Sequence, residues 1–100
     1  MLKKEISSMK WAFIYTLDDP ADEMRIDTIG TLTCVGLPGI EAAPEIARQL
    51  VGDGVKLIEL CGGFSGAGLA AVVAAVDGSV PVGAVFYGVE ARGGLQRVFG

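Results

Sequence analysis

The sequence predicts an α/β protein, in which a small two-layer sheet of about four strands with a parallel core is joined by two crossover helices. Three observations support this fold class. Four short runs are rich in β-branched and aromatic residues. Two segments place apolar residues at helical spacing. Strands and helices alternate over most of the chain, in the order strand, strand, helix, strand, helix, strand, and such crossovers make strands parallel.

The first two predicted strands precede the first helix. Residues 10–16, KWAFIYT, are aromatic or β-branched and apolar on both faces. Residues 17–23, LDDPADE, have the composition of a loop. A second strand begins over 25–28 and is clearest over 30–36. If the first strand pairs with the second through the acidic loop, the pair is antiparallel.

The first predicted helix spans residues 40–51. Its apolar stripe consists of Ile40, Ala43, Ile46, Ala47, Leu50 and Val51. Pro44 is tolerated because it lies close to the first turn, where a missing amide hydrogen costs little. Gly52 and Gly54 supply a left-handed stop.

Two further strands flank the second helix. A strand is predicted over residues 55–60, and Ser65 is expected to cap a helix over 66–76. Asp77-Gly78 closes this helix, and the last strand is 80–86, VPVGAVF.

The chain has 100 residues, the size of one domain. We predict a flexible N-terminal lead-in over 1–9, a single α/β domain over 10–87 and a glycine-rich C-terminal tail or edge element over 88–100. Equal-handed crossovers place both helices on one side of the sheet, so the other face needs a cover. The tail or a second subunit would provide it. Because hydrophobic residues make up 51% of the chain, we expect a homodimer or a larger homo-oligomer.

Composition excludes several classes of function. The net charge is -4 and the eight basic residues are scattered, which argues against nucleic-acid binding. No apolar run spans a bilayer, and the N-terminus lacks the apolar core of a signal peptide. We therefore expect a cytoplasmic protein with reduced Cys34 and Cys61. Without histidine, neither a Ser-His-Asp nor a Cys-His site can form.

No cofactor or metal site is indicated. The acidic residues between the first two strands lack the spacing and glycine of a calcium loop, so a solvated charged loop is the favoured interpretation. They are Asp18, Asp19, Asp22, Glu23 and Asp27. The glycines of residues 62–68 do not have the spacing of a dinucleotide fingerprint or a P-loop.

The stretch LIELCGGFSGAG, residues 57–68, is the candidate site. Ligands bind at the carboxyl ends of parallel strands, and a helix N-terminus with flanking glycines receives anions readily. We predict a small anionic ligand here, with the alternative that the glycines serve only backbone conformation and packing. The candidate ligand-binding residues are Gly36, Pro38, Gly62, Gly63, Phe64, Ser65 and Gly66.

Glu59 and Cys61 are the candidate catalytic residues. Glu59 interrupts a strand predicted to be buried, so its carboxylate would have to be paired, hydrogen-bonded or protonated. It would act as an acid or base, or structurally in a salt bridge to Lys10 or Arg48. Cys61 near a helix N-terminus would be a reactive thiolate, or a buried small side chain. Cys34, in the middle of a strand, is expected in the core.

Two other features have mainly structural interpretations. Residues 63–67, GFSGA, are one residue short of the nucleophile-elbow pattern, and without histidine Ser65 is better explained as a helix cap. Trp11, Phe13 and Tyr15 alternate on one face of the first strand, which is typical of a core or an interface rather than a ligand-stacking platform.

Four stretches resemble a family of small bacterial α/β proteins known only as a domain of unknown function. They are VGLP (35–38), GV (54–55), LIELCGGF (57–64) and VPVG (80–83). The resemblance covers residues 10–86, with I-E-L-C-G-G-F as its signature. The family usually has glycine in place of Ser65, and its C-terminal region does not match from Tyr87 onward. The resemblance implies an intracellular single-domain protein and supplies no activity, substrate or catalytic residue.

Three hypotheses of function follow. The first is an oligomer that binds a small anionic metabolite at residues 61–68, with Glu59 contacting or orienting it. The second is a cofactor-free isomerase-like or lyase-like enzyme that uses Glu59 and Cys61. The third is a structural or interaction protein whose oligomer interface is its function.

Overall fold

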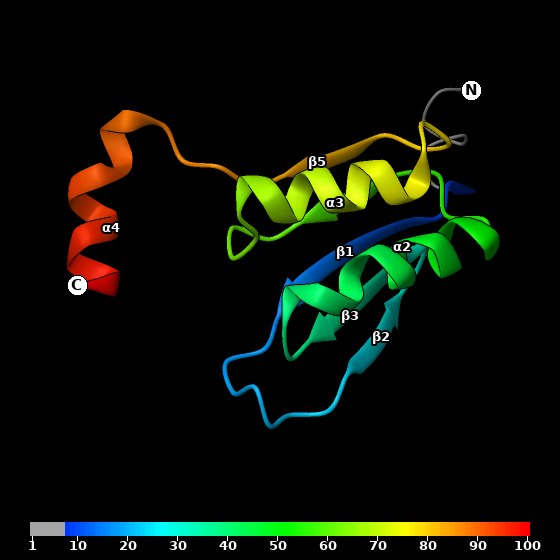
Figure 1. Cartoon of the computed structure of the whole chain (residues 1–100), viewed down its shortest axis with the longest axis horizontal. Helices are drawn as coiled ribbons and strands as arrows, with labels where there is room; N and C mark the ends of the chain where they lie inside the picture. Colours follow the sequence, from blue (N-terminus) through cyan, green and yellow to red (C-terminus); the bar gives the residue numbers. More distant parts are fainter. Residues whose placement is uncertain (1–7) are drawn as a thin grey trace.

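The computed structural model contains a five-stranded sheet in the order β2-β3-β1-β4-β5 (Figure 1). The structure describes residues 8–100, so most of the predicted lead-in, residues 1–7, lies outside the described residues. The strands are β1 (Trp11–Thr16), β2 (Arg25–Ile29), β3 (Leu32–Leu37), β4 (Ile58–Leu60) and β5 (Val82–Ala84). Strands β3, β1, β4 and β5 are parallel to one another, and β2 is antiparallel to β3. The α/β class with a parallel core is confirmed.

The first strand lies in the centre of the sheet. Phe13 of β1 is in register with Cys34 of β3 on one side and with Glu59 of β4 on the other. The antiparallel pairing considered for β1 is therefore not formed. A separate strand, β2, takes the antiparallel position instead, because Gly30 and Thr31 form a two-residue hairpin turn. Gly30 has φ +58°, a conformation that favours glycine.

Two helices connect the parallel strands and lie next to each other over the sheet (Figure 1). A short 3₁₀ segment, η1 (Ile40–Ala42), leads into α2 (Ala43–Gly52), and α3 spans Gly66–Val76. Both predicted helices are confirmed. Pro44 lies in the first turn of α2, and Gly54 beyond its end has φ +98°.

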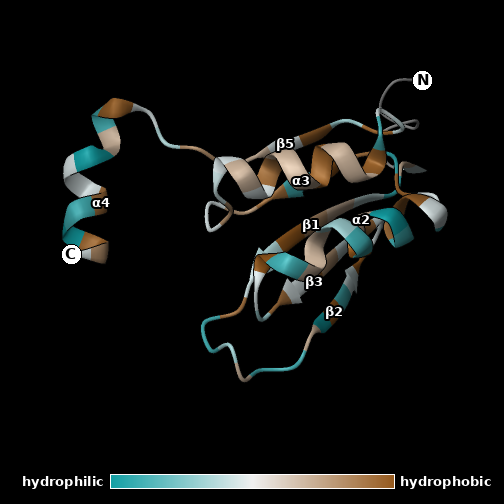
Figure 2. Cartoon of the chain, viewed as in Figure 1, coloured by the Kyte–Doolittle hydropathy of each residue, from teal (hydrophilic) through white to brown (hydrophobic). Residues whose placement is uncertain are grey.

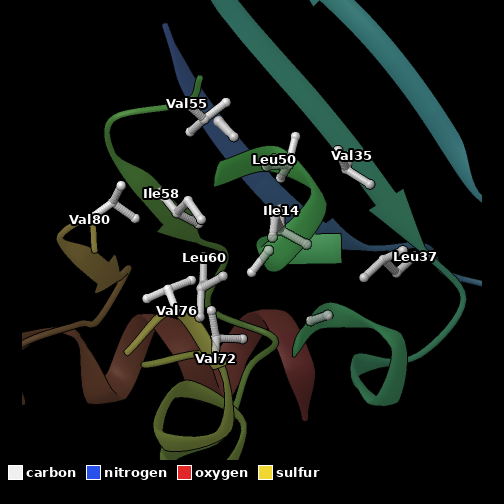
Figure 3. Close-up of a cluster of buried hydrophobic side chains, with 13 residues drawn as sticks. Ile14, Val35, Leu37, Leu50, Val55, Ile58, Leu60, Val72, Val76 and Val80 are labelled. Carbon is white, nitrogen blue, oxygen red and sulfur yellow. The ribbon is translucent and has the colours of Figure 1, made fainter. Parts of the chain in front are cut away.

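The hydrophobic core lies between the sheet and these two helices (Figure 3). Alternate strand residues point toward the helices, because successive side chains of a strand face opposite sides. From the sheet come Ala12, Ile14, Val35, Leu37, Ile58 and Leu60, and from the helices Ala43, Ala47, Leu50, Val72 and Val76. None of the helices in residues 8–100 has the length and apolar character that crossing a membrane requires.

The opposite face of the sheet, which we call the open face, carries the other strand residues. Trp11, Phe13 and Tyr15 lie there half-buried, and the rings of Phe13 and Tyr15 stack with their centroids 6.2 Å apart. Cys34, in register with Phe13, lies on the same face and is half-buried. The expectation that Cys34 is a core residue is wrong, because its strand has only one covered face.

The C-terminal segment forms a helix that stands apart from the rest of the chain (Figure 1). After β5 come an extended stretch, a 3₁₀ segment η2 (Val89–Ala91) and helix α4 (Arg92–Phe99). Sequence reasoning expected a glycine-rich tail or edge element here, because Gly93 and Gly94 lower helix propensity. Figure 2 shows α4 as a mixture of apolar and polar residues at the end of an apolar connection.

Candidate functional site

The carboxyl ends of β1, β3, β4 and β5 meet at one edge of the sheet, because these strands are parallel. Backbone hydrogen bonds continue past the strands and hold the connecting loops at this edge. The Cys61 amide donates to the Ile14 carbonyl at 3.0 Å, and the Val85 amide donates to the Leu60 carbonyl at 2.9 Å. The turn over residues 61–68 therefore has a defined position relative to the ends of three strands.

Cys61 and Gly63 of this turn lie next to Thr16 of β1, with Cys61 half-buried and Gly63 exposed. The Gly63 amide donates to Cys61 Sγ at 3.3 Å, and Thr16 Oγ1 lies 3.8 Å from the same sulfur. A Cβ on Gly63 would lie 2.6 Å from Thr16 Oγ1. A side chain on Gly63 would therefore have to displace the Thr16 hydroxyl, and the Cys61 thiol is half-buried.

Ser65 caps α3, as predicted from the sequence. Its Oγ accepts a hydrogen bond from the Gly68 amide at 3.0 Å. Within residues 8–100, the amides of Gly66 and Ala67 have no hydrogen-bond acceptor. No acidic residue occurs in the first turn of α3. The positive end of this helix is thus open to an external anion.

The start of α3 packs closely against the rest of the edge. A Cβ on Gly68 would lie 3.1 Å from Ile40 Cδ1 and 3.3 Å from the Phe64 ring. Phe64 packs against the hydrophobic core, and its amide donates to the Cys61 carbonyl at 3.2 Å. Phe64 and Gly68 therefore fix the position of the helix N-terminus.

The Ser65 cap is testable by substitution. We expect Ser65→Ala to lower the free energy of unfolding by about 0.5–2 kcal/mol, because the Gly68 amide loses its acceptor. Urea denaturation monitored by circular dichroism measures this loss. Ser65→Thr keeps the hydroxyl and should retain most of the stability. Equal losses in both variants would show that the hydroxyl does not act as a cap.

Glu59 does not occupy the buried position that the sequence suggested. It is exposed on the open face, because the helices cover only the other side of β4. Neither predicted salt bridge forms. Lys10 Nζ donates instead to the Asp53 carbonyl at 3.2 Å, and Arg48 pairs with Glu45 at 2.9 Å.

Glu59 and Cys61, the predicted catalytic pair, make separate contacts. No hydrogen bond links them in the part of the chain that the structure describes. Glu59 lines a shallow hollow of about 180 Å³ with Gly83, Ala84 and Val85. Cys61 contacts Thr16 instead.

Gly36 and Pro38 lie at the end of β3 and are held there by packing rather than by the turn over residues 61–68. Gly36 is buried beneath the ring of Tyr15, and a Cβ on Gly36 would lie 2.7 Å from the ring. This packing accounts for its lack of a side chain. Pro38 is half-buried directly after β3, at the same edge as Cys61.

Sequence reasoning missed two hollows. One, of about 670 Å³, lies between the turn and α4, where Gly62, Tyr87 and Arg92 line it. Arg92 has no ion-pair partner among residues 8–100. The helical spacing of Leu95 and Phe99 was the only signal for this feature, and the two glycines of α4 obscured it.

The second hollow, of about 620 Å³, lies between α2 and β2 near the amino ends of the strands. Lys10, Ile26, Thr33 and Gln49 are among its lining residues. It could not be anticipated, because the sequence did not separate β2 from β3. The acidic β1–β2 loop is exposed, and residues 8–100 contain no group of three or more side chains suited to a metal ion.

Fold and site together define a small α/β protein with a capped, glycine-rich strand-to-helix turn at the carboxyl edge of its sheet. The chain belongs to the family described as "Family of unknown function (DUF6506)", whose model matches residues 9–100. The match includes α4, so the expectation that the family resemblance ends before Tyr87 is wrong. No curated protein matches the chain, and no solved structure matches it.

Proposed function

We propose that this protein binds a small anionic metabolite, a carboxylate or a phosphate ester, at the turn over residues 61–68. The observation that carries this proposal is the N-terminus of α3, where the Gly66 and Ala67 amides have no acceptor among the described residues. Free amides and the helix dipole together favour an anion at such a position.

The backbone of the turn is accessible on its outer side. A Cβ on Gly66 would meet no atom within 4 Å, and one on Gly62 would make only ordinary contacts with Tyr87 and Val85. Arg92 lines the hollow that adjoins Gly62. Gly62 and Gly66 thus leave room for a ligand on the outer side of the turn backbone.

The neighbouring helix N-terminus is a poorer site for an anion. Glu41 lies in the first turn of η1 and Glu45 in the first turn of α2. The Glu41 carboxylate folds back close to Gly39. These negative charges repel an incoming anion, which favours the α3 terminus at the same edge.

The proposal also includes the cellular compartment, the source and the family signature of the chain. We infer a cytoplasmic protein of bacterial origin, with the I-E-L-C-G-G-F stretch as its family signature. Its two thiols, Cys34 and Cys61, are free, which accords with a reducing compartment. The alternative of an enzyme that uses Glu59 and Cys61 finds no supporting contact in the structure.

A thermal-shift screen tests the proposed ligand class. The probes are inorganic phosphate, phosphorylated sugars, and di- and tricarboxylates. A ligand at one hundred times its dissociation constant adds about 2.7 kcal/mol, and each kcal/mol raises the Tm by roughly 4–8 °C in a domain of this size. We expect at least one anion to raise the Tm by about 10 °C or more.

A matched pair of variants locates the binding site. Gly66→Asp puts a carboxylate at the open start of α3, where it competes for the free amides and still favours the helix. It should abolish the ligand-induced shift. Ala70→Asp adds the same charge at an exposed position one turn further along α3, and should retain the shift. A shift that survives Gly66→Asp, or no shift with any probe, would refute the proposal.

A further inference from the structure

Within residues 8–100, no helix covers the open face of the sheet, which carries an apolar stripe. Trp11, Phe13 and Tyr15 run across it on the central strand, and Cys34 lies next to Phe13 on β3. A parallel sheet is normally covered on both sides. This face therefore requires a partner surface.

The C-terminal segment, residues 85–100, is an apolar element whose large side chains are mostly exposed in the part of the chain that the structure describes; we call it the arm. Phe86 is 85% exposed, Val89 89% and Phe99 82%. Ala91, Leu95, Val98 and Phe99 lie along one side of α4 at helical spacing. Within the described chain α4 packs mainly against its own η2 segment.

Charges on the arm and on the rest of the chain are complementary. The arm carries two basic residues, Arg92 and Arg97, and one acidic residue, Glu90, whereas residues 8–84 carry ten acidic and four basic side chains. On the open face, Arg25 is paired with Asp27 at 2.9 Å, and this hydrogen bond raises the pKa of the Arg25 guanidinium. Glu59, on the same face, has no partner among residues 8–100.

We infer that the arm docks on the open face of a second copy of this chain, and that the second copy's arm docks reciprocally. The apolar side of α4 packs against the stripe of Trp11, Phe13 and Tyr15. Arg92, at the margin of that side, pairs with the exposed Glu59. The result is a closed homodimer with two-fold symmetry. This inference does not depend on the proposed ligand.

The position of the arm favours docking on the sheet of a second copy over docking on the sheet of its own chain. β5 is an edge strand, so the arm leaves the sheet at its border. Residues 85–88 are extended and carry α4 away from the sheet (Figure 1). The family model also includes the arm, so the arm is part of the shared domain.

The available area is sufficient for a stable dimer. Each arm presents Phe86, Tyr87 and Phe99, and an aromatic side chain buries about 150–250 Å². Two exchanged arms therefore cover roughly 900–1,500 Å² before the sheet's own surface is added. Stable interfaces bury about 1,200–2,000 Å² in total.

Light scattering after size exclusion tests the dimer with the full chain. The wild-type protein should have twice the monomer mass of 10.3 kDa at micromolar concentration. Leu95→Asp places a charge in the apolar side of α4 and should give a monomer with an unchanged circular dichroism spectrum. Gly93→Asp puts the same charge on the opposite side of α4 and should remain dimeric. A monomeric wild-type protein, or a dimeric Leu95→Asp variant, would overturn the inference.

Disulfide trapping tests where the arm docks. In a Cys61→Ser background, Cys34 on the open face is the only native thiol. Leu95→Cys should then form a reducible covalent dimer under mild oxidation, whereas Gly93→Cys should not. An intrachain disulfide would place the arm on its own sheet, and equal cross-linking of both variants would show no specific docking. Either result contradicts the inference.

Discussion

Ile14→Ala is expected to lower the free energy of unfolding by about 2–5 kcal/mol, the range for truncating a large buried aliphatic side chain. Ile14 is fully buried on the central strand. Val35 and Leu60 flank it in register on the neighbouring strands. Because both neighbours are held by sheet hydrogen bonds, the cavity cannot collapse easily.

The size of this loss matters, since a domain of this length has about 5–15 kcal/mol of stability in total. Urea denaturation measures it, provided that the variant folds. Ile26→Ala is the matched control, because Ile26 belongs to the same sheet but is 58% exposed on the edge strand. We expect a change within about 0.5 kcal/mol for the control. Similar losses in both variants would show that Ile14 is not at the centre of the core.

Local sequence patterns predicted the elements well where each pattern had a single physical meaning. The helix over 66–76 was predicted with the bounds that α3 has, because Ser65 marks its start and Asp77-Gly78 its end. Gly52 and Gly54 similarly marked the end of α2, whereas its start was predicted at Ile40, where the structure has the 3₁₀ segment η1. Caps and breakers act on the adjacent backbone, so a single sequence is enough to identify them.

The order of the strands could not be obtained in this way. β1 is apolar on both faces and fits any position in a sheet that is covered on both sides. Its central place depends on contacts with β3 and β4, which are distant in sequence. Gly30 was predicted as part of a strand over 30–36, because the apolar residues around it fit one strand, whereas the structure has a hairpin turn there.

Glu59 shows the same limit at the site. Strand alternation correctly separated Glu59 from Ile58 and Leu60, but alternation does not say which face the helices cover. The location of the turn at the carboxyl edge was predicted, because parallel strands place their ends together. Thr16 and Arg92 were missed, since each approaches the turn from a segment far away in the sequence.

Gly63→Ala is expected to destabilise the protein by about 1–2 kcal/mol, within the usual range for a single substitution, because Gly63 is exposed but the Thr16 and Cys61 side chains would have to move. The new Cβ would lie 2.6 Å from Thr16 Oγ1 and 3.3 Å from Cys61 Sγ. At roughly 4–8 °C of Tm per kcal/mol, thermal denaturation resolves this effect. Gly66→Ala is the control within the same turn, because its Cβ would meet nothing within 4 Å. It should be neutral or slightly stabilising, since alanine favours the helix.

A double-mutant cycle shows whether the contact with Thr16 is the cause. Thr16→Ala removes the hydroxyl that the new Cβ would meet, so Gly63→Ala should cost less in that background than in the wild type. The displaced Cys61 thiol gives a second measurement, because it loses the Gly63 amide as a hydrogen-bond donor. We expect its rate of reaction with iodoacetamide to change in Gly63→Ala and to stay unchanged in Gly66→Ala. If the losses at Thr16 and Gly63 were simply additive, Gly63 would not be required by this contact, and the ligand interpretation of Gly63 would gain support.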